Sequence, residues 1–92
     1  MIKTFSDKDT QQLFAQQRPR RFVNLDKVAR RKLVYLHAAT TLDDLKIPPG
    51  NRLERLKGNR ADQYSIRIND QFRLCFKWID GDAYDVEICD YH

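Results

Sequence analysis

The sequence is poor in side chains that bind metal ions. It contains two cysteines and two histidines, at positions Cys75, Cys89, His37 and His92. Their spacing does not match a structural zinc site. The acids Asp80, Asp82 and Asp85 resemble turn and edge residues, so no carboxylate cluster indicates a magnesium site. We therefore expect a protein without a metal or another cofactor.

Long hydrophobic runs are also missing, so no segment is expected to span a membrane. The opening Met1–Phe5 is too short to be the apolar part of a secretory signal. No repeat, low-complexity segment or change of composition divides the chain. We expect a single domain over residues 1–92, located in the cytoplasm with its thiols reduced.

Positive charge is absent from the last part of the chain. Residues 80–92 contain five acids and no lysine or arginine, which gives a charge of −5. Residues 1–79 carry all 17 basic residues and 8 acids, which gives +9. A basic body of this kind indicates a polyanionic partner. The alternative is a protein of high isoelectric point without such a partner.

Apolar and polar residues alternate strictly over much of Gln63–His92, which predicts three β-strands. The apolar positions form three sets: Tyr64, Ile66 and Ile68; Phe72, Leu74, Phe76 and Trp78; and Tyr84, Val86 and Ile88. One face of the predicted sheet is therefore buried, and the other carries polar side chains.

Three-residue loops at 69–71 and 80–82 keep these apolar sets on one face. This register places Leu74 opposite Ile66 and Ile88, and Trp78 opposite Tyr84. It also places Arg67 opposite Arg73, with Tyr91 nearby on the same polar face. Like charges that face each other across strands cost stability, and a bound anion would relieve that cost. The alternative is that these side chains are simply solvated.

Before this sheet, the pattern predicts a short edge strand at Met1–Phe5 and two helices. The first helix covers about Asp7–Gln16, with Ser6 as its cap. The second follows a cap at Asn24 and has an apolar stripe. The stripe consists of Leu25, Val28, Ala29, Leu33 and Leu36.

An irregular strand is expected at Asn51–Lys57, because its two leucines are three residues apart. A basic loop at 58–62 then leads into the sheet. The order of elements predicts an α+β fold, in which two N-terminal helices pack on one face of a small antiparallel sheet.

Several short motifs occur together in an order that resembles the HigB branch of the RelE-like toxins of bacterial toxin–antitoxin pairs. They are Met1–Phe5, Pro48–Leu53, Leu56–Arg60, Tyr64–Ile66, Phe72–Leu74 and the terminal Asp90–His92. The resemblance covers essentially the whole chain.

This resemblance implies a RelE-like microbial RNase fold and an endoribonuclease that cuts mRNA in the A site of the 30S ribosomal subunit. It implies cleavage without a metal. It also implies a HigA-like helix-turn-helix antitoxin, and operator DNA bound by the toxin–antitoxin complex. Two alternatives stay open: a non-enzymatic nucleic-acid-binding module, and a degenerate toxin that only binds its antitoxin.

The resemblance also assigns roles to individual residues. The expected catalytic residues are Lys57, Arg73, Asp90, Tyr91 and His92, and the expected RNA-binding residues are Glu54, Arg55, Arg60 and Arg67. Glu54 stands where some relatives have an active-site histidine. It is either an alternative proton carrier or an ion-pair partner for a neighbouring arginine.

Overall fold

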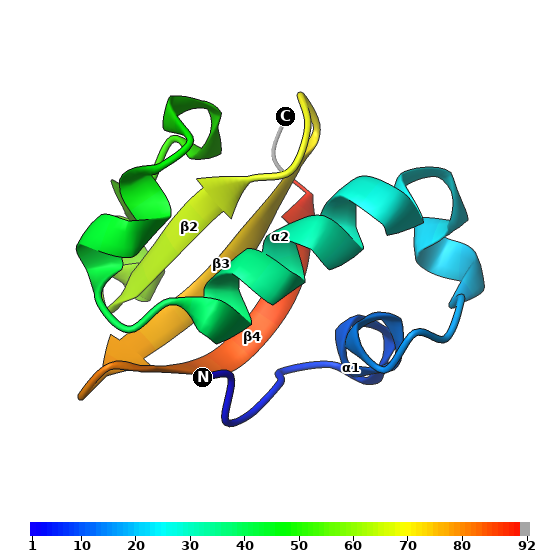
Figure 1. Ribbon diagram of the computed structural model, residues 1–92, viewed down its shortest axis with the longest axis horizontal. Helices are drawn as coiled ribbons and strands as arrows, with labels where there is room; N and C mark the ends of the chain where they lie inside the picture. The colour runs from blue at the N-terminus through cyan, green and yellow to red at the C-terminus, as the bar shows by residue number, and fades with distance from the viewer. Residues whose placement is uncertain (91–92) are drawn as a thin grey trace.

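A four-stranded antiparallel sheet with strand order β1-β2-β3-β4 forms the centre of the molecule (Figure 1). The computed structural model describes residues 1–90. The strands are β1 (Glu54–Arg55), β2 (Gln63–Arg67), β3 (Phe72–Ile79) and β4 (Asp82–Asp90). The helices are α1 (Lys8–Phe14) and α2 (Asp26–Ala38). Short 3₁₀ turns lie between α1 and α2, between α2 and β1, and between β1 and β2. The predicted α+β class is confirmed.

The central register is the one that the alternation predicts. Ile66 and Ile88 both face Leu74, and Arg67 faces Arg73. The loop between β2 and β3 is closed by Asn69, whose side-chain oxygen accepts hydrogen bonds from the backbone N–H groups of residues 71 and 72, at 2.9 and 2.8 Å. A single Asn side chain thus replaces backbone partners in this turn.

The turn between β3 and β4 differs from the prediction. Asp80 and Gly81 form a two-residue turn with φ values of 51° and 84°, as a tight hairpin of primed type requires. Trp78 consequently faces Ala83, so its predicted pairing with Tyr84 is wrong. A bulge at Asp85, whose φ is 52°, inserts one residue into β4 and restores the predicted register at Leu74 and beyond.

The N-terminal segment pairs with β4 in parallel, through isolated bridges from Ile2 to Ala83 and from Phe5 to Val86. It is too irregular to form the predicted strand. Its backbone nevertheless exchanges hydrogen bonds of 2.8 to 3.1 Å with Ala83 and Val86. The segment therefore covers an edge of the sheet that would otherwise expose unpaired backbone groups.

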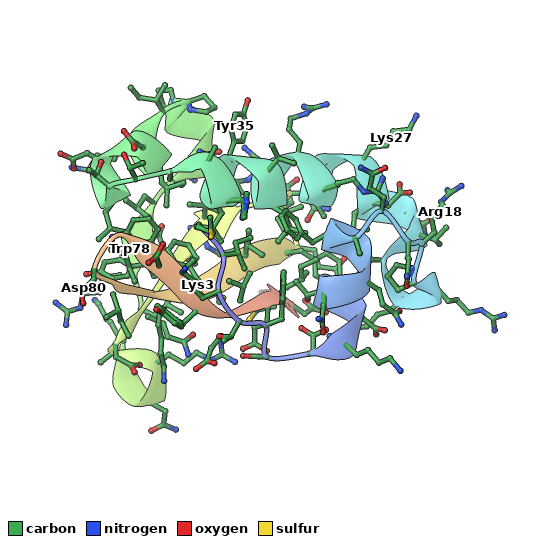
Figure 2. All side chains as sticks on the ribbon, turned by 60° about the horizontal axis from the view of Figure 1, so that its bottom comes forward. Lys3, Arg18, Lys27, Tyr35, Trp78 and Asp80 are labelled. Carbon is green, nitrogen blue, oxygen red and sulfur yellow. The ribbon has the colours of Figure 1, made fainter. Side chains whose placement is uncertain are left out.

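Both helices begin later than predicted. Asp7, rather than Ser6, caps α1 by accepting from the backbone N–H of Thr10 at 3.0 Å. Asn24 does not cap α2, because it lies inside the 3₁₀ turn η1 (Arg20–Leu25) that precedes the helix. Asp26 in the first turn of α2 forms an ion pair with Arg18 at 3.1 Å. In Figure 2, this end of α2, marked by Lys27 and Arg18, lies on the right, and the turn at Asp80 lies on the far left of the view.

The core lies where α1 and α2 meet the sheet. α2 contacts β3, and α1 contacts both α2 and β4. The helices contribute Leu13, Ala29, Leu33 and Leu36, and the sheet contributes Ile66, Leu74, Phe76, Val86 and Ile88. Burial of these apolar side chains supplies most of the driving force for folding. Among residues 1–90, no helix has both the length and the apolar character needed to cross a bilayer.

The predicted strand over Asn51–Lys57 is mostly absent, since only Glu54 and Arg55 pair with β2. Asn51 instead ends a 3₁₀ turn, η3 (Pro49–Asn51), and is fully buried. Its amide nitrogen donates to the carbonyls of Leu45 and Ile47, and its amide oxygen accepts from Lys32 of α2. These bonds hold the chain in a turn, so extended backbone begins only after Arg52.

Candidate functional site: an arginine pocket beside β2

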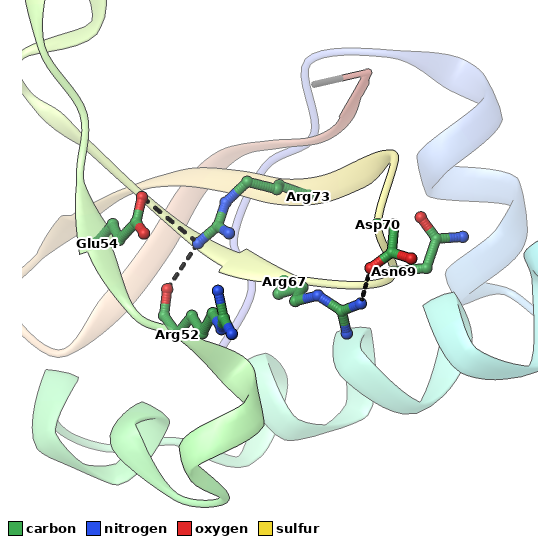
Figure 3. A pocket seen from close by; sticks show the side chains of 6 residues that line it. All are labelled: Arg52, Glu54, Arg67, Asn69, Asp70 and Arg73. Carbon is green, nitrogen blue, oxygen red and sulfur yellow. Dashed lines mark hydrogen bonds and ion pairs between the residues drawn. The ribbon is translucent and has the colours of Figure 1, made fainter. Parts of the chain in front are cut away.

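A pocket of about 300 Å³ lies between the segment before β1 and the β2–β3 hairpin (Figure 3). Its lining is formed by Arg52, Glu54, Arg67, Asn69, Asp70 and Arg73. Three guanidinium groups and two carboxylates thus meet around one small volume. Such a lining suits an anionic ligand better than a cation or an apolar molecule.

Arg73 is held rigidly in the wall of this pocket. Its Nε donates to the hydroxyl of the buried Ser65 at 2.8 Å, and its Nη2 donates to the carbonyl of Arg52 at 2.6 Å. Its side chain is only 12% exposed. Nη1 donates to no acceptor within residues 1–90. One edge of the guanidinium is therefore fixed by the protein, and the other keeps its donors available.

The opposed arginines leave the sheet on the face that points away from the core, because they alternate with Ile66 and Leu74. A carboxylate from the chain itself lies near each of them. Asp70 forms an ion pair with Arg67, and Glu54 lies 3.9 Å from Nη2 of Arg73. These acids supply part of the negative charge that the opposed pair requires.

A cation from α2 approaches the same region. Lys32 lies near Arg67, and its pKa is lowered, first by burial and then by the positive charges of Arg31 and Arg67. Its bond to Asn51 links α2 to the turn that precedes the pocket. The positive potential around Arg67 is therefore produced by more residues than those that line the pocket.

Three of the nine predicted site residues come together in this pocket: Glu54, Arg67 and Arg73. The predicted residues Arg55, Lys57 and Arg60 do not line it. Arg55 donates through Nε to the carbonyl of residue 61 at 3.0 Å, and Lys57 is exposed just before the turn η4 (Gly58–Arg60). Arg60 forms an ion pair with Glu87 at 2.8 Å. Their roles in binding RNA stay predictions.

Asp90 faces Phe72 across β3 and β4, so it leaves the sheet on the opposite side from Arg73. Its carboxylate accepts a hydrogen bond from the amide of Gln71 at 3.1 Å. The predicted catalytic residues Tyr91 and His92 lie outside the described residues. The roles assigned to these three terminal residues stay predictions.

Three lining residues were missed by the sequence reasoning: Arg52, Asn69 and Asp70. Asp70 carried a usable signal, because an acid three residues after Arg67 within a tight loop can reach back to it. No local sequence pattern indicated that Arg52 lines the pocket, because its position depends on the buried side chain of Asn51 and on a left-handed backbone conformation.

Neither cysteine is well placed to act as a nucleophile: Cys75 is buried, and the surroundings of Cys89 disfavour its thiolate. Neither forms a disulfide, and the pKa of Cys89 is raised by a hydrogen bond with Cys75 and by burial. A thiol held protonated in this way is a poor nucleophile and a poor metal ligand. Within residues 1–90, no three His, Cys, Asp or Glu side chains gather in a group that could hold a metal ion.

Comparison with solved structures first defines the fold. A chain of the YoeB–YefM toxin–antitoxin complex from Staphylococcus aureus matches all of this chain and 98% of its own length, with a TM-score of 0.58 and 22% identity. A second YoeB–YefM structure from the same organism matches with 21% identity. The protein therefore has the fold of a chain found in such complexes.

Comparison of sequences then defines the family. The family model for the RelE-like toxin HigB of type II toxin–antitoxin systems matches residues 3–92. Toxin HigB-1 of Vibrio cholerae is 42% identical over 85 residues, which cover 90% of each chain. Endoribonuclease HigB of Proteus vulgaris is 42% identical over 41 residues, or 45% of each chain. The chain belongs to the HigB-like toxin family.

Proposed function

We propose that this protein is the endoribonuclease toxin of a toxin–antitoxin pair, and that it cuts mRNA in the ribosomal A site without a metal ion. One observation carries the proposal: Arg73 is fixed along one edge, its Nη1 has no acceptor among residues 1–90, and it lines a pocket with a net positive lining. Family membership and the basic body of the chain support an RNA substrate.

The reaction begins with attack of a ribose 2′-oxygen on the adjacent phosphorus, after a base removes the hydroxyl proton. The bond from phosphorus to the 5′-oxygen then breaks, and an acid protonates that oxygen. The products are a 2′,3′-cyclic phosphate and a free 5′-hydroxyl. Arg73 stabilises the negative charge that accumulates on the phosphorane oxygens, and its fixed geometry means that little reorganisation is needed.

Proton transfer is assigned to two groups. Glu54 is 60% exposed and lies next to Arg73, so its carboxylate can accept a proton from a ribose hydroxyl in the pocket. His92 is the proposed proton carrier on the leaving-group side, because imidazole titrates near neutral pH. Asp90 and Tyr91 orient it or the substrate, and Lys57 adds positive charge, in the roles that the family resemblance implies.

The proposed partners follow from family membership. A HigA-like helix-turn-helix antitoxin neutralises the toxin, and the complex binds operator DNA. Free toxin acts in the cytoplasm on messages held by the 30S subunit. We propose that α1 and α2 cover one face of the sheet, so that the face carrying Arg67 and Arg73 is left for mRNA.

The test is to map the ends of cut messages in a translating lysate, with naked RNA as a parallel substrate. We expect 2′,3′-cyclic or 3′-phosphate ends, and cleavage only when ribosomes are present. Arg73→Ala should lower the cleavage rate by roughly 10²- to 10³-fold, the usual effect of removing a preorganised charge-stabilising donor.

Arg30→Ala is the matched control for this variant. Arg30 also uses its guanidinium to hold carbonyls, those of Leu13 and Gln17, but these lie in and after α1 rather than in the pocket. Cleavage by this control should be unchanged at a temperature where both variants are folded. Equal rates for Arg73→Ala and the parent protein would refute the role of Arg73.

A further inference from the structure

The three arginines of the pocket differ in how their charges are satisfied. Arg73 donates to Ser65 and to a carbonyl, and Arg67 pairs with Asp70. Arg52 contributes only its backbone carbonyl to these bonds, and its guanidinium has no hydrogen-bond or ion-pair partner among residues 1–90. Arg52 therefore supplies the uncompensated charge of the lining.

The backbone holds Arg52 in a defined orientation. Its φ and ψ are 47° and 59°, a left-handed conformation that side chains other than glycine rarely adopt. Two bonds maintain it: the N–H of Arg52 donates to the carbonyl of Pro49 at 3.1 Å, and its own carbonyl accepts from Arg73 at 2.6 Å. Because these two bonds hold the backbone in this conformation, the side chain of Arg52 points to the pocket rather than along the strand.

The charges of the lining match one phosphodiester. Three guanidinium groups and the two carboxylates of Glu54 and Asp70 leave one positive charge. A phosphodiester carries one negative charge, so its binding would neutralise the pocket. Within residues 1–90, the donors without an acceptor include the whole guanidinium of Arg52, Nη1 of Arg73, and Nε and Nη1 of Arg67, whose Nη2 already holds Asp70. Arg52 is the one of the three arginines whose guanidinium is used nowhere among these residues.

We propose that Arg52 is a phosphate-binding residue of this pocket, and that it holds a phosphate group together with Nη1 of Arg73. Arg73 then has a second role as the positioning residue that fixes the backbone of Arg52. That the phosphate belongs to mRNA rests on the function proposed above. The anion site itself does not depend on that function, so the two can be tested separately.

The experiment titrates the intact protein with inorganic phosphate at pH 7 and follows the arginine Nε–H signals by nitrogen-15 NMR. Arg52→Gln should weaken phosphate binding about fivefold, as expected for loss of one exposed charge-assisted bond. Arg52→Lys should recover part of the affinity. Both variants keep a Cβ, so they impose the same backbone strain, and Lys8→Gln removes an exposed charge of α1 as the control.

Each result has a defined meaning. No phosphate-dependent shift in the parent protein, or equal affinity in Arg52→Gln and the parent, would overturn the phosphate site. The same variants are also assayed for message cleavage. Phosphate binding that depends on Arg52, without message cleavage by the parent protein, keeps the site and rejects the nuclease. Cleavage by Arg52→Gln at the parental rate rejects the role of Arg52 on RNA and keeps the nuclease.

Discussion

At the scale of single residues, Asp70 places a carboxylate in a pocket whose proposed ligand is an anion. Its side chain is fully exposed, and its partner Arg67 is three residues away along the chain. Exposed pairs of this kind contribute little to stability, because water and salt screen them. The carboxylate therefore neutralises Arg67 in the absence of a ligand, and an incoming phosphate can displace it at little cost.

Removal of this carboxylate should strengthen binding. We expect Asp70→Asn to raise the affinity for a 2′-O-methylated RNA, which cannot be cut, by about threefold at low salt, because the phosphate then no longer competes with an exposed carboxylate for Arg67. The free energy of unfolding should change little. The measurements are fluorescence anisotropy over a range of salt concentrations and urea denaturation.

Asp43→Asn is the control for Asp70→Asn. Asp43 is 84% exposed and also pairs with a cation three residues away, Lys46, so the change of charge and the type of pair are the same. It does not line the pocket. Tighter RNA binding by both variants would show that net charge alone is responsible, and that Asp70 has no particular effect on the site.

The position of a site residue could be predicted from the sequence where the period of a strand determines which face the side chain is on. The opposition of Arg67 and Arg73 follows from the alternation of their neighbours Ile66 and Leu74, because a shift of one residue would bury charges. Arg52 was not predictable. Its orientation depends on a hydrogen bond from a residue 21 positions later and on the burial of Asn51, which no local pattern indicates.

At the scale of elements, β4 shows why loop lengths are harder to predict than faces. The alternation requires one residue more between Trp78 and Ile88 than a regular two-residue hairpin would have. It does not indicate whether this residue lies in the turn or in β4. The prediction placed that residue in the turn with Gly81, whereas the structure places it in the bulge at Asp85. Either position gives the same register at Leu74, so the pairing of β3 with β2 and with the end of β4 was predicted correctly.

The turn η2 (Leu42–Lys46) begins with a capping box that makes its stability dependent on pH. Hydrogen bonds from the backbone N–H groups of Thr40 and Thr41 lower the pKa of Asp44. A group whose folded-state pKa is lowered stabilises the fold above its unfolded pKa, here 3.8, and this stabilisation is lost as the pH falls through the folded value. Protonation of Asp44 should therefore account for part of the loss of folding stability at low pH.

Asp44→Asn should reduce the dependence of the unfolding free energy on pH below about pH 4, because the variant has no carboxylate to protonate there. It should also be less stable than the parent at pH 7. Urea denaturation at a series of pH values measures both effects. Asp43→Asn, at the adjacent carboxylate outside the capping box, is the comparison, and parallel pH profiles for the parent and Asp44→Asn would contradict the assignment.

At the scale of the whole molecule, the segregation of charge along the sequence has a structural outcome. Three acids of β4 form ion pairs with cationic groups: Glu87 with Arg60 of η4, Asp85 with Lys77 of β3, and Asp82 with the amino group of Met1. The acidic end of the chain therefore neutralises part of the basic body. The arginine pocket lies outside these pairs and keeps its positive charge.

A whole-cell measurement tests the proposed toxin. Induced expression of the full chain should arrest growth, and co-expression of a neighbouring antitoxin gene should restore it. Deletion of His92 should abolish the arrest while the protein stays folded, because it leaves all the core side chains described above in place. Antitoxin capture by the shortened chain is the control for folding, and growth arrest by that chain would count against a catalytic role of His92.

The side chains that line the pocket, among the residues that the structure describes, fall between positions 52 and 73 of the chain. One synthetic DNA cassette that spans these codons can therefore randomise these six positions in a single cloning step, without altering α1, α2 or β4. If the protein arrests growth, cells that survive induction carry inactive pockets. Sequencing the survivors that still capture antitoxin would then rank the lining positions by their tolerance to substitution in one selection.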